Sequence, residues 1–448
     1  MVTLARKLRL TDYFTLAFGA MVGVGWLVVM DDWLRRGGPL GGILGFAIGG
    51  AVLLPIGYVY GRLAMAMPDA ASEIAYTARA FADTVSFGTG WLMMLAYFIV
   101  CPWEAVAVGR IASFIFPQLN SVELYRVAGQ PVYLPQLILG LALTAIITTL
   151  NYRGIELSAS FQNWTTFGLL ALFALFASCG FARGSISNLQ PGFSHGGLLS
   201  VLLIVQIVPY FMTGFESVAK CSEEASPAFQ SRGFSKAILA AVLAGIVFYT
   251  VVIAAVTWVH PWQALTNQRF ATAYAFEQAF RSRWIVNVIL AAALLSLLKV
   301  FNGNFLAASR LFFALGRRSM IEKRVGAVHG RYHTPFVAVL GVGAMTAVLV
   351  FAGSALLVPV TEVGSMASAV GWLATCCAFF VIERGTGPRT FAVMGATAAI
   401  MLVGIKVLPF VPGSFTVSEW EALAVWVGLG MALRQRARAT ARAATPAP

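Results

Sequence analysis

The sequence predicts an all-α protein that spans a membrane about twelve times. Of its 448 residues, 59% are hydrophobic and only 11% are charged, whereas an ordinary soluble domain carries about 25% charged residues. Long uncharged runs recur along the chain, for example at 37–61 and 237–268, and about 20 apolar residues suffice to cross the hydrocarbon core. Because these runs lack the alternation of barrel strands, we expect helices.

The apolar runs also give the expected order of helices. The twelve expected spans are 12–34, 39–66, 85–116, 132–150, 157–181, 198–220, 236–259, 284–316, 335–353, 358–383, 389–410 and 418–433. No linker between them is long enough to separate two domains, so residues 12–433 are expected to form one domain. Residues 1–11 precede it, and the Arg- and Ala-rich residues 434–448 are expected to form a disordered tail.

The net charge of +13 has an explanation that does not involve nucleic acid. Most of the Lys and Arg residues fall in the segments that would share a side with the N-terminus, and cytoplasmic loops of membrane proteins are rich in such residues. We therefore expect a multi-pass protein of the plasma (inner) membrane with both termini in the cytoplasm. An even number of spans follows from that arrangement.

The first expected span contains a weak point at mid-membrane depth. Its sequence from Gly19 to Trp26 includes Gly23-Val24-Gly25, and two glycines around one residue weaken a helix. The glycines could serve close helix packing through small residues. Alternatively, the helix is broken there and its free amides bind an anionic group, as in transporters with discontinuous helices.

The sixth expected span contains a second interruption. The stretch Pro209-Tyr210-Phe211-Met212-Thr213-Gly214-Phe215-Glu216 places a proline, a glycine and a carboxylate within one span. The first and sixth spans would begin two successive groups of five helices. Interrupted segments at matching places in two halves are the best sequence indication of a transporter's central site.

These stretches, in this order, resemble the amino acid–polyamine–organocation (APC) superfamily. Further similarity lies in Pro68-Asp69-Ala70-Ala71-Ser72-Glu73, in Ser222-Glu223-Glu224 and in the stretch from Phe301 to Arg310. The resemblance implies a LeuT-like fold, in which a 5+5 inverted repeat (12–181 and 198–383) is followed by two C-terminal helices (389–433). It also implies an amino acid or amine permease that works by alternating access, as a proton-coupled carrier or an exchanger.

The resemblance further implies which residues contact the substrate. Backbone amides would bind a carboxylate, helix carbonyls would hold an amino group, and side chains of the third, sixth and eighth spans would complete the pocket. In that order the positions are Val22, Gly23, Val24 and Gly25; Gly19 and Met212; and Cys101, Ala105, Val108, the aromatic gate Tyr210 and Asn304. Arginine/agmatine antiporters carry a tryptophan where this chain has Asn304, so their way of stacking a guanidinium is not expected here.

Three ionisable residues at membrane depth require a partner or a function, because unpaired charges there are costly. They are Glu104, Glu216 and Lys299, and the resemblance places a proton-sensing carboxylate at Glu216. Lys299 aligns with a position that supplies sodium ligands in sodium-coupled relatives, so its ammonium could replace that ion. The alternative is a static ion pair of Lys299 with Glu104 or Glu216.

Glu104 has two interpretations. It could recognise a cationic group of the substrate, or it could neutralise Lys299, and the cost of an unpaired buried charge favours neutralisation. Sodium coupling in place of proton coupling also stays open. The substrate could be a neutral amino acid, a cationic one or a decarboxylated amine such as a polyamine, although the Gly-Val-Gly break favours a carboxylate.

Other functional classes have less support. An enzyme would need a catalytic set at one depth, but all four histidines fall in expected loops. A channel would show a filter loop or a charged ring, and neither is evident. The five cysteines lack metal-ligand spacing and are expected to serve packing. The chain is therefore expected to be a carrier of small molecules with neither cofactor nor metal.

Overall fold

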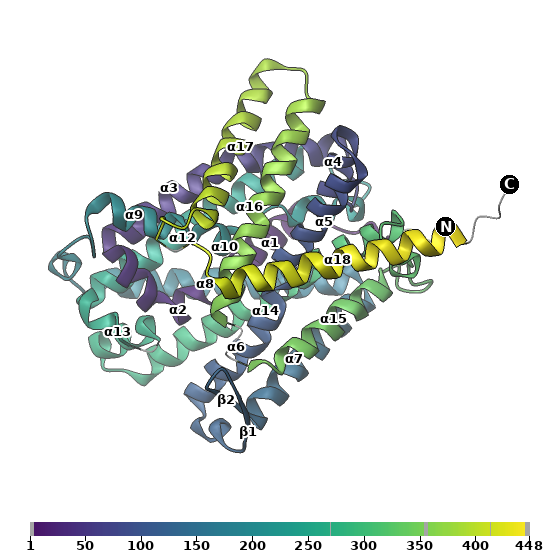
Figure 1. Cartoon of the computed structure of the whole chain (residues 1–448). Coiled ribbons are helices and arrows are strands. Elements are labelled where there is room, and N and C mark those ends of the chain that lie inside the picture. Colours follow the sequence, from purple (N-terminus) through teal and green to yellow (C-terminus); the bar gives the residue numbers. More distant parts are fainter. Residues whose placement is uncertain (1–3, 269, 354–356, 413, 444–448) are drawn as a thin grey trace.

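The computed structural model describes residues 4–268, 270–353, 357–412 and 414–443, and it is composed mainly of helices (Figure 1). The helices of eight or more residues are α1 Leu10–Met21, α3 Met30–Ala66, α4 Glu73–Ala80, α5 Asp83–Phe98, α6 Val100–Ile115, α7 Leu134–Arg153, α8 Ile155–Ala182, α9 Gly197–Val205, α12 Arg232–Val259, α13 Ala271–Phe280, α14 Arg283–Arg317, α15 Phe336–Val350, α16 Leu357–Ile382, α17 Thr386–Val407 and α18 Val417–Ala443. Three shorter helices are α2 Gly25–Val28, α10 Val208–Met212 and α11 Ser217–Lys220.

Nine helical segments within the described residues are long and apolar enough to cross a membrane. They coincide with nine of the twelve expected spans. The other three, 198–220, 335–353 and 418–433, correspond to the divided segment α9–α11, to the shorter apolar helix α15 and to α18. The predicted all-helical, multi-pass class is confirmed, although α3 also includes the end of the first expected span and bends at Gly38, where φ is 64°.

The expectation of helices alone missed a β-hairpin. Strands β1 Glu123–Val127 and β2 Gln130–Tyr133 pair antiparallel between α6 and α7. Their two-residue turn, Ala128-Gly129, has positive φ at both positions (48° and 77°), which suits the twist of a tight hairpin. The Tyr125 hydroxyl donates a hydrogen bond of 2.6 Å to the carbonyl of Phe351, so the hairpin is tied to the end of α15.

The expectation of a disordered tail at 434–448 was wrong for most of that segment. Helix α18 continues to Ala443 and crosses one side of the bundle in Figure 1. Arg434 is paired with Asp83 and lies 4.8 Å from the centre of the Phe87 ring, so contacts with α5 support the end of the helix. Residues 444–448 lie outside the described part of the chain.

Small residues allow close contact between α3 and the first part of the divided sixth span. A Cβ added to Gly41, Gly45 or Gly49 would stand 2.5 to 2.8 Å from a side-chain atom of Ser200, Ile204 or Val208, respectively. These glycines recur every four residues and therefore share one face of α3. Such stripes permit membrane helices to approach closely, and here they fix α9 and α10 against α3.

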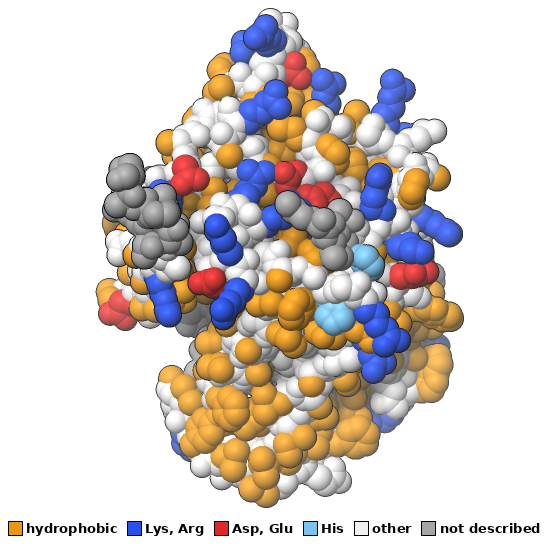
Figure 2. All heavy atoms as spheres, turned by 90° about the vertical axis from the view of Figure 1, so that its right-hand side faces the viewer, with side chains coloured by type: hydrophobic (Ala, Val, Ile, Leu, Met, Phe, Trp, Pro, Cys, Tyr) orange, Lys and Arg blue, Asp and Glu red, His pale blue; other side chains and the backbone are white. Residues whose placement is uncertain are grey.

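One end of the bundle is rich in basic side chains. We call the end that carries Arg6, Glu223 and Arg317 the N-terminal face. Figure 2 looks onto the side where the N-terminus lies and shows many Lys and Arg side chains over its upper part, above a broad apolar area. A basic face on this side agrees with the charge distribution along the sequence.

Candidate functional site

The first helix is interrupted where the sequence indicates. Helix α1 ends at Met21 and α2 begins at Gly25, and Val22 has extended dihedral angles (φ −91°, ψ 94°). Side chains of other helices bind the carbonyls exposed by the break. Ser296 of α14 donates hydrogen bonds to Val22 O (3.0 Å) and Gly23 O (2.8 Å).

The sixth span is interrupted beside the same point. Between α10 and α11, Gly214 has a φ of 133°, and a Cβ added there would stand 2.6 Å from the carbonyl carbon of Ala20. This short distance shows that the two breaks are in direct contact. Only glycine readily adopts this backbone angle in so little space. The Thr213 hydroxyl also donates a hydrogen bond of 2.8 Å to Ser368 of α16.

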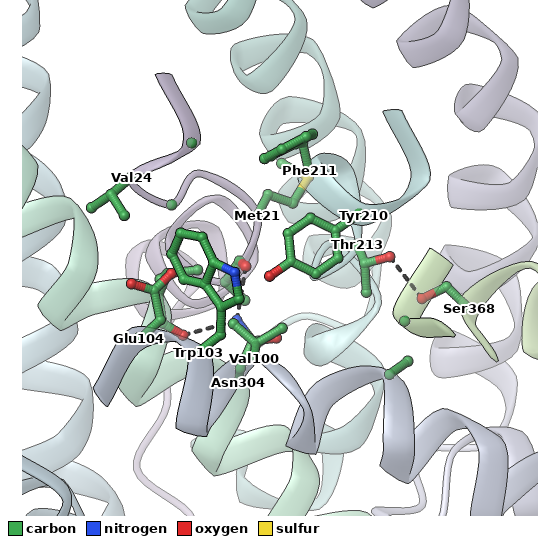
Figure 3. Close-up of a pocket in the computed structure, with 16 residues that line it drawn as sticks. Met21, Val24, Val100, Trp103, Glu104, Tyr210, Phe211, Thr213, Asn304 and Ser368 are labelled. Carbon is green, nitrogen blue, oxygen red and sulfur yellow. Dashed lines mark hydrogen bonds between the residues drawn. The ribbon is translucent and has the colours of Figure 1, made fainter. Parts of the chain in front are cut away.

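A small cavity of about 20 Å³ lies at this junction, and Figure 3 shows the side chains around it. That volume suffices for about one water molecule. Of the sequence-predicted residues, Gly23, Val24, Gly25, Glu104, Tyr210 and Asn304 line the cavity. The structure adds residues that the sequence did not suggest, namely Ala20, Met21, Ala96, Val100, Trp103, Phe211, Thr213, Val300, Gly364 and Ser368.

Three predicted residues of the third span do not line this cavity. The Cys101 thiol donates to the Tyr97 carbonyl at 3.7 Å, the Ala105 carbonyl faces Gly140 of α7, and Val108 packs against the core. Instead, Val100, Trp103 and Glu104 contribute from this part of the span. The span divides into α5 and α6 at Ile99, directly before the residues that line the cavity.

The other predicted residues surround the cavity without lining it. Gly19 and Val22 offer carbonyl oxygens to Lys299, while Met212 packs between α3 and α12. Glu216 is fully buried and accepts hydrogen bonds of 3.1 Å from the Gly214 amide and from the Trp372 indole. It therefore stabilises the break in the sixth span.

Lys299 lies behind the interrupted first helix. Its ammonium is completely buried and donates hydrogen bonds to the carbonyls of Gly19 (3.4 Å) and Val22. Neither Glu104 nor Glu216 forms an ion pair within 4.0 Å of Lys299 in the part of the chain that the structure describes. The hydrogen bonds of Lys299 thus go to backbone oxygens, the ligand type of a hard cation.

Glu104 faces the cavity. Its side chain is 2% exposed, and its Oε1 lies 3.2 Å from where a Cβ would stand on Gly23. Its Oε2 has no hydrogen-bond partner among the described residues. A buried carboxylate oxygen without a partner is costly, and the side-chain oxygen of Asn304 at the same cavity likewise has no partner among the described residues.

Sequence reasoning also missed the residue that connects the two breaks. The hydroxyl of Tyr249 on α12 lies 3.2 Å from Met21 O and 3.1 Å from Phe211 O. Tyr249 stands in an uninterrupted apolar run, so no local signal marks it. Ser296, in contrast, lies one helical turn before Lys299 and could have been found from that spacing.

A larger cavity, which we call the vestibule, lies next to the central one. Its volume is about 320 Å³, and it shares Trp103, Tyr210 and Phe211 with the central cavity. Charged side chains line it as well, and these are Asp31, Asp32, Arg35, Arg36, Arg110 and Glu362. The three shared aromatic residues therefore separate the vestibule from the junction of the breaks.

Comparison with known proteins gives a consistent result. The family model described as amino acid permease matches residues 12–411. The chain is 25% identical to the methylthioribose transporter of Bacillus subtilis (strain 168) over 75% of this chain and 72% of that protein. It is 25% identical to a branched-chain amino acid permease (85% and 80% covered) and 26% identical to a gamma-aminobutyric acid permease (72% and 67%) of the same organism.

Proposed function

Because the chain belongs to the amino acid permease family, we propose that it carries an amino acid or a related amine by alternating access, driven by protons or by exchange. The observation that carries this proposal is the contact between the two helix breaks at Gly214 and Ala20. Breaks of this kind leave backbone groups free for a substrate where lipid would otherwise forbid them.

The substrate would bind at the junction of the breaks. The first amides of α2 have no partner within their helix and suit a carboxylate, while Glu104 suits an ammonium. A cavity of about 20 Å³ is too small for either type of molecule. Binding would therefore require the shared aromatic residues Trp103, Tyr210 and Phe211 to move and join the vestibule to the central cavity.

Uptake into proteoliposomes tests this function. The purified protein is reconstituted, a proton gradient is imposed, and radiolabelled leucine, arginine and putrescine are offered in turn, each with unlabelled competitors. We expect saturable uptake or exchange of at least one class, abolished in empty liposomes. The proposal fails if no amino acid or amine is taken up or exchanged under any gradient.

Lys299 is proposed to occupy the place of a coupling cation. Its ammonium binds two carbonyls of the interrupted first helix, as a sodium ion would, and a desolvated lysine can also release its proton. Uptake by the wild-type protein is therefore expected to be the same in sodium and in potassium buffers. Lys299→Ala is expected to lose proton-driven uptake.

Arg434→Ala is the control, because this buried cation pairs with Asp83 and lines neither the central cavity nor the vestibule. It is expected to retain proton-driven uptake. Strict dependence of the wild-type protein on sodium would contradict the role of Lys299, whatever the substrate is.

A further inference from the structure

A series of buried charged residues leads from the central cavity to the N-terminal face. Thr213 lines the cavity. Glu216, directly before α11, and Lys220, its last residue, have no exposed surface. The chain then reaches Glu223, whose side chain is 24% exposed. Within eleven residues the sixth span thus passes from the cavity to the surface, and it carries a charged residue about every three or four positions.

The centre of this series is an ion pair between Glu73 and Lys220. Lys220 Nζ lies 2.5 Å from Glu73 Oε1, and neither side chain has any exposed surface. The Tyr60 hydroxyl donates a further hydrogen bond of 2.8 Å to Glu73, and the ammonium stands 4.7 Å from the centre of the Tyr97 ring. The pair joins α4 to α11, segments 147 residues apart.

Polar atoms without partners surround this ion pair. Within the described residues, Glu73 Oε2 and the Ser217 hydroxyl have no hydrogen-bond partner, although both residues are buried. The buried hydroxyls of Tyr76 and Tyr97 lie within electrostatic range of Glu73. Groups of this kind are normally satisfied in native proteins. Two such atoms beside further buried hydroxyls mark a region that is suited to contact with water or a polar solute.

Further ion pairs lie between this pair and the N-terminal face. Glu224 and Arg310 form a buried pair with an oxygen–nitrogen distance of 2.7 Å, and Arg317 binds both Glu223 and Asp69. The amide of Leu8 donates to the Glu224 carbonyl at 2.9 Å, so the N-terminal segment covers this layer. The other end of the molecule, in contrast, holds the vestibule of about 320 Å³.

We infer that the hydroxyls around Glu73 and Lys220 line the second half of the substrate path, and that this ion pair is the gate that closes it. The inference rests on the proposed transport function. A substrate released at the N-terminal face has to pass between α4 and α11, so the pair must separate. Water or the polar substrate then satisfies the oxygens that lack partners in the closed state.

The native thiol of Cys221 reports whether the gate is open. Cys221 follows Lys220 directly and is completely buried. In a background where Cys101, Cys179, Cys376 and Cys377 are replaced by alanine, a charged maleimide that cannot cross the membrane is added to one side of sealed vesicles. The rate at which the Cys221 thiol reacts then measures access from that side.

The variant Glu73→Gln with Lys220→Met removes both charges together, so it leaves no unpaired buried charge. We expect Cys221 to react at least about tenfold faster from the N-terminal side, because the closed state loses the pair that stabilises it. Lys220→Arg keeps the pair and is expected to react as slowly as the background protein. Reaction from the vestibule side should change in neither variant.

The matched control is Arg62→Gln with Glu383→Gln, which removes a partly exposed pair of 3.1 Å that joins the end of α3 to the end of α16. It should leave the Cys221 rate unchanged. The inferred gate would be contradicted if the Cys221 thiol reacted no faster in Glu73→Gln with Lys220→Met, or if its rate rose equally in this control. The proposed function fails separately, if the wild-type protein transports no amine or amino acid.

Discussion

At the scale of single residues, the junction of the breaks contains two buried ionisable groups that differ in their hydrogen bonding. The ammonium of Lys299 binds backbone carbonyls, whereas one oxygen of Glu104 has no partner among the described residues and faces the cavity. The sequence favoured neutralisation of Lys299 by Glu104. Glu104 and Lys299 interact electrostatically without a close ion pair among the described residues, so both interpretations of Glu104 stay open, including contact with the substrate.

The variant Glu104→Gln tests that role. It removes the charge but keeps the size of the side chain, and a hydrogen bond to a charged group contributes about 1.5–3 kcal/mol. The KM for an amine-bearing substrate should therefore rise about ten- to a hundredfold. Glu277→Gln is the control, since Glu277 pairs with Arg283 near the protein surface. An unchanged KM in Glu104→Gln would contradict contact with the substrate and would favour neutralisation of Lys299 as the role of Glu104.

Gly214 permits the contact between the two breaks. In Gly214→Ala, the methyl group would stand 2.6 Å from Ala20, and the φ of 133° strains any other residue by about 1–3 kcal/mol. We expect loss of uptake and a lower thermal unfolding temperature. Gly88→Ala, where the added methyl meets nothing within 4 Å, should preserve both. Full uptake by Gly214→Ala would show that the contact is dispensable.

At the scale of elements, the two interrupted spans are positioned by the intact helices around them. Ser296 and Lys299 of α14 bind the carbonyls of the first break, and Ser368 of α16 accepts a hydrogen bond from Thr213 at the second. Tyr249 of α12 contacts both. Intact helices thus satisfy the backbone groups that the breaks expose, as an apolar environment requires.

The variant Tyr249→Phe removes the hydroxyl that connects the breaks. Each lost hydrogen bond costs about 0.5–1.5 kcal/mol, so we expect a lower unfolding temperature together with slower uptake. Thr250→Val is the control, because the Thr250 hydroxyl bonds only within its own helix. If Tyr249→Phe reduced stability but left the transport rate intact, Tyr249 would have a structural role alone.

At the scale of the whole molecule, the two ends of the bundle are in different states. The vestibule reaches the aromatic residues above the central cavity, whereas buried ion pairs close the N-terminal face. A carrier that works by alternating access must exchange these states. Under the proposed mechanism, the ion pairs of the N-terminal face would separate when the carrier changes state.

The orientation of the chain can be tested directly. The charge distribution predicts that both termini are cytoplasmic. Fluorescent protein fused after Pro448 should therefore fluoresce in bacterial cells, and alkaline phosphatase fused at the same place should be inactive. Active phosphatase would place the C-terminus outside and contradict the even number of spans.

By itself, the sequence determined the class of the protein and the places of its breaks. Lipid forces the backbone to satisfy its own hydrogen bonds, so apolar runs of sufficient length become helices whatever they pack against. Glycine and proline interrupt a helix locally, and the first and sixth spans divide where Gly23, Gly25 and Gly214 stand. Both signals are contained within a few neighbouring residues.

Only the tertiary structure decided which side chains meet. Successive residues of a helix point about 100° apart, so the face that α6 turns to the cavity carries Trp103 and Glu104 and not Cys101 and Ala105. Likewise, the sequence gives no sign that Lys220 pairs with Glu73, because segments 147 residues apart meet only through packing. Local chemistry thus fixed the helices and their breaks, and the packing of distant helices decided the partners of each buried charge.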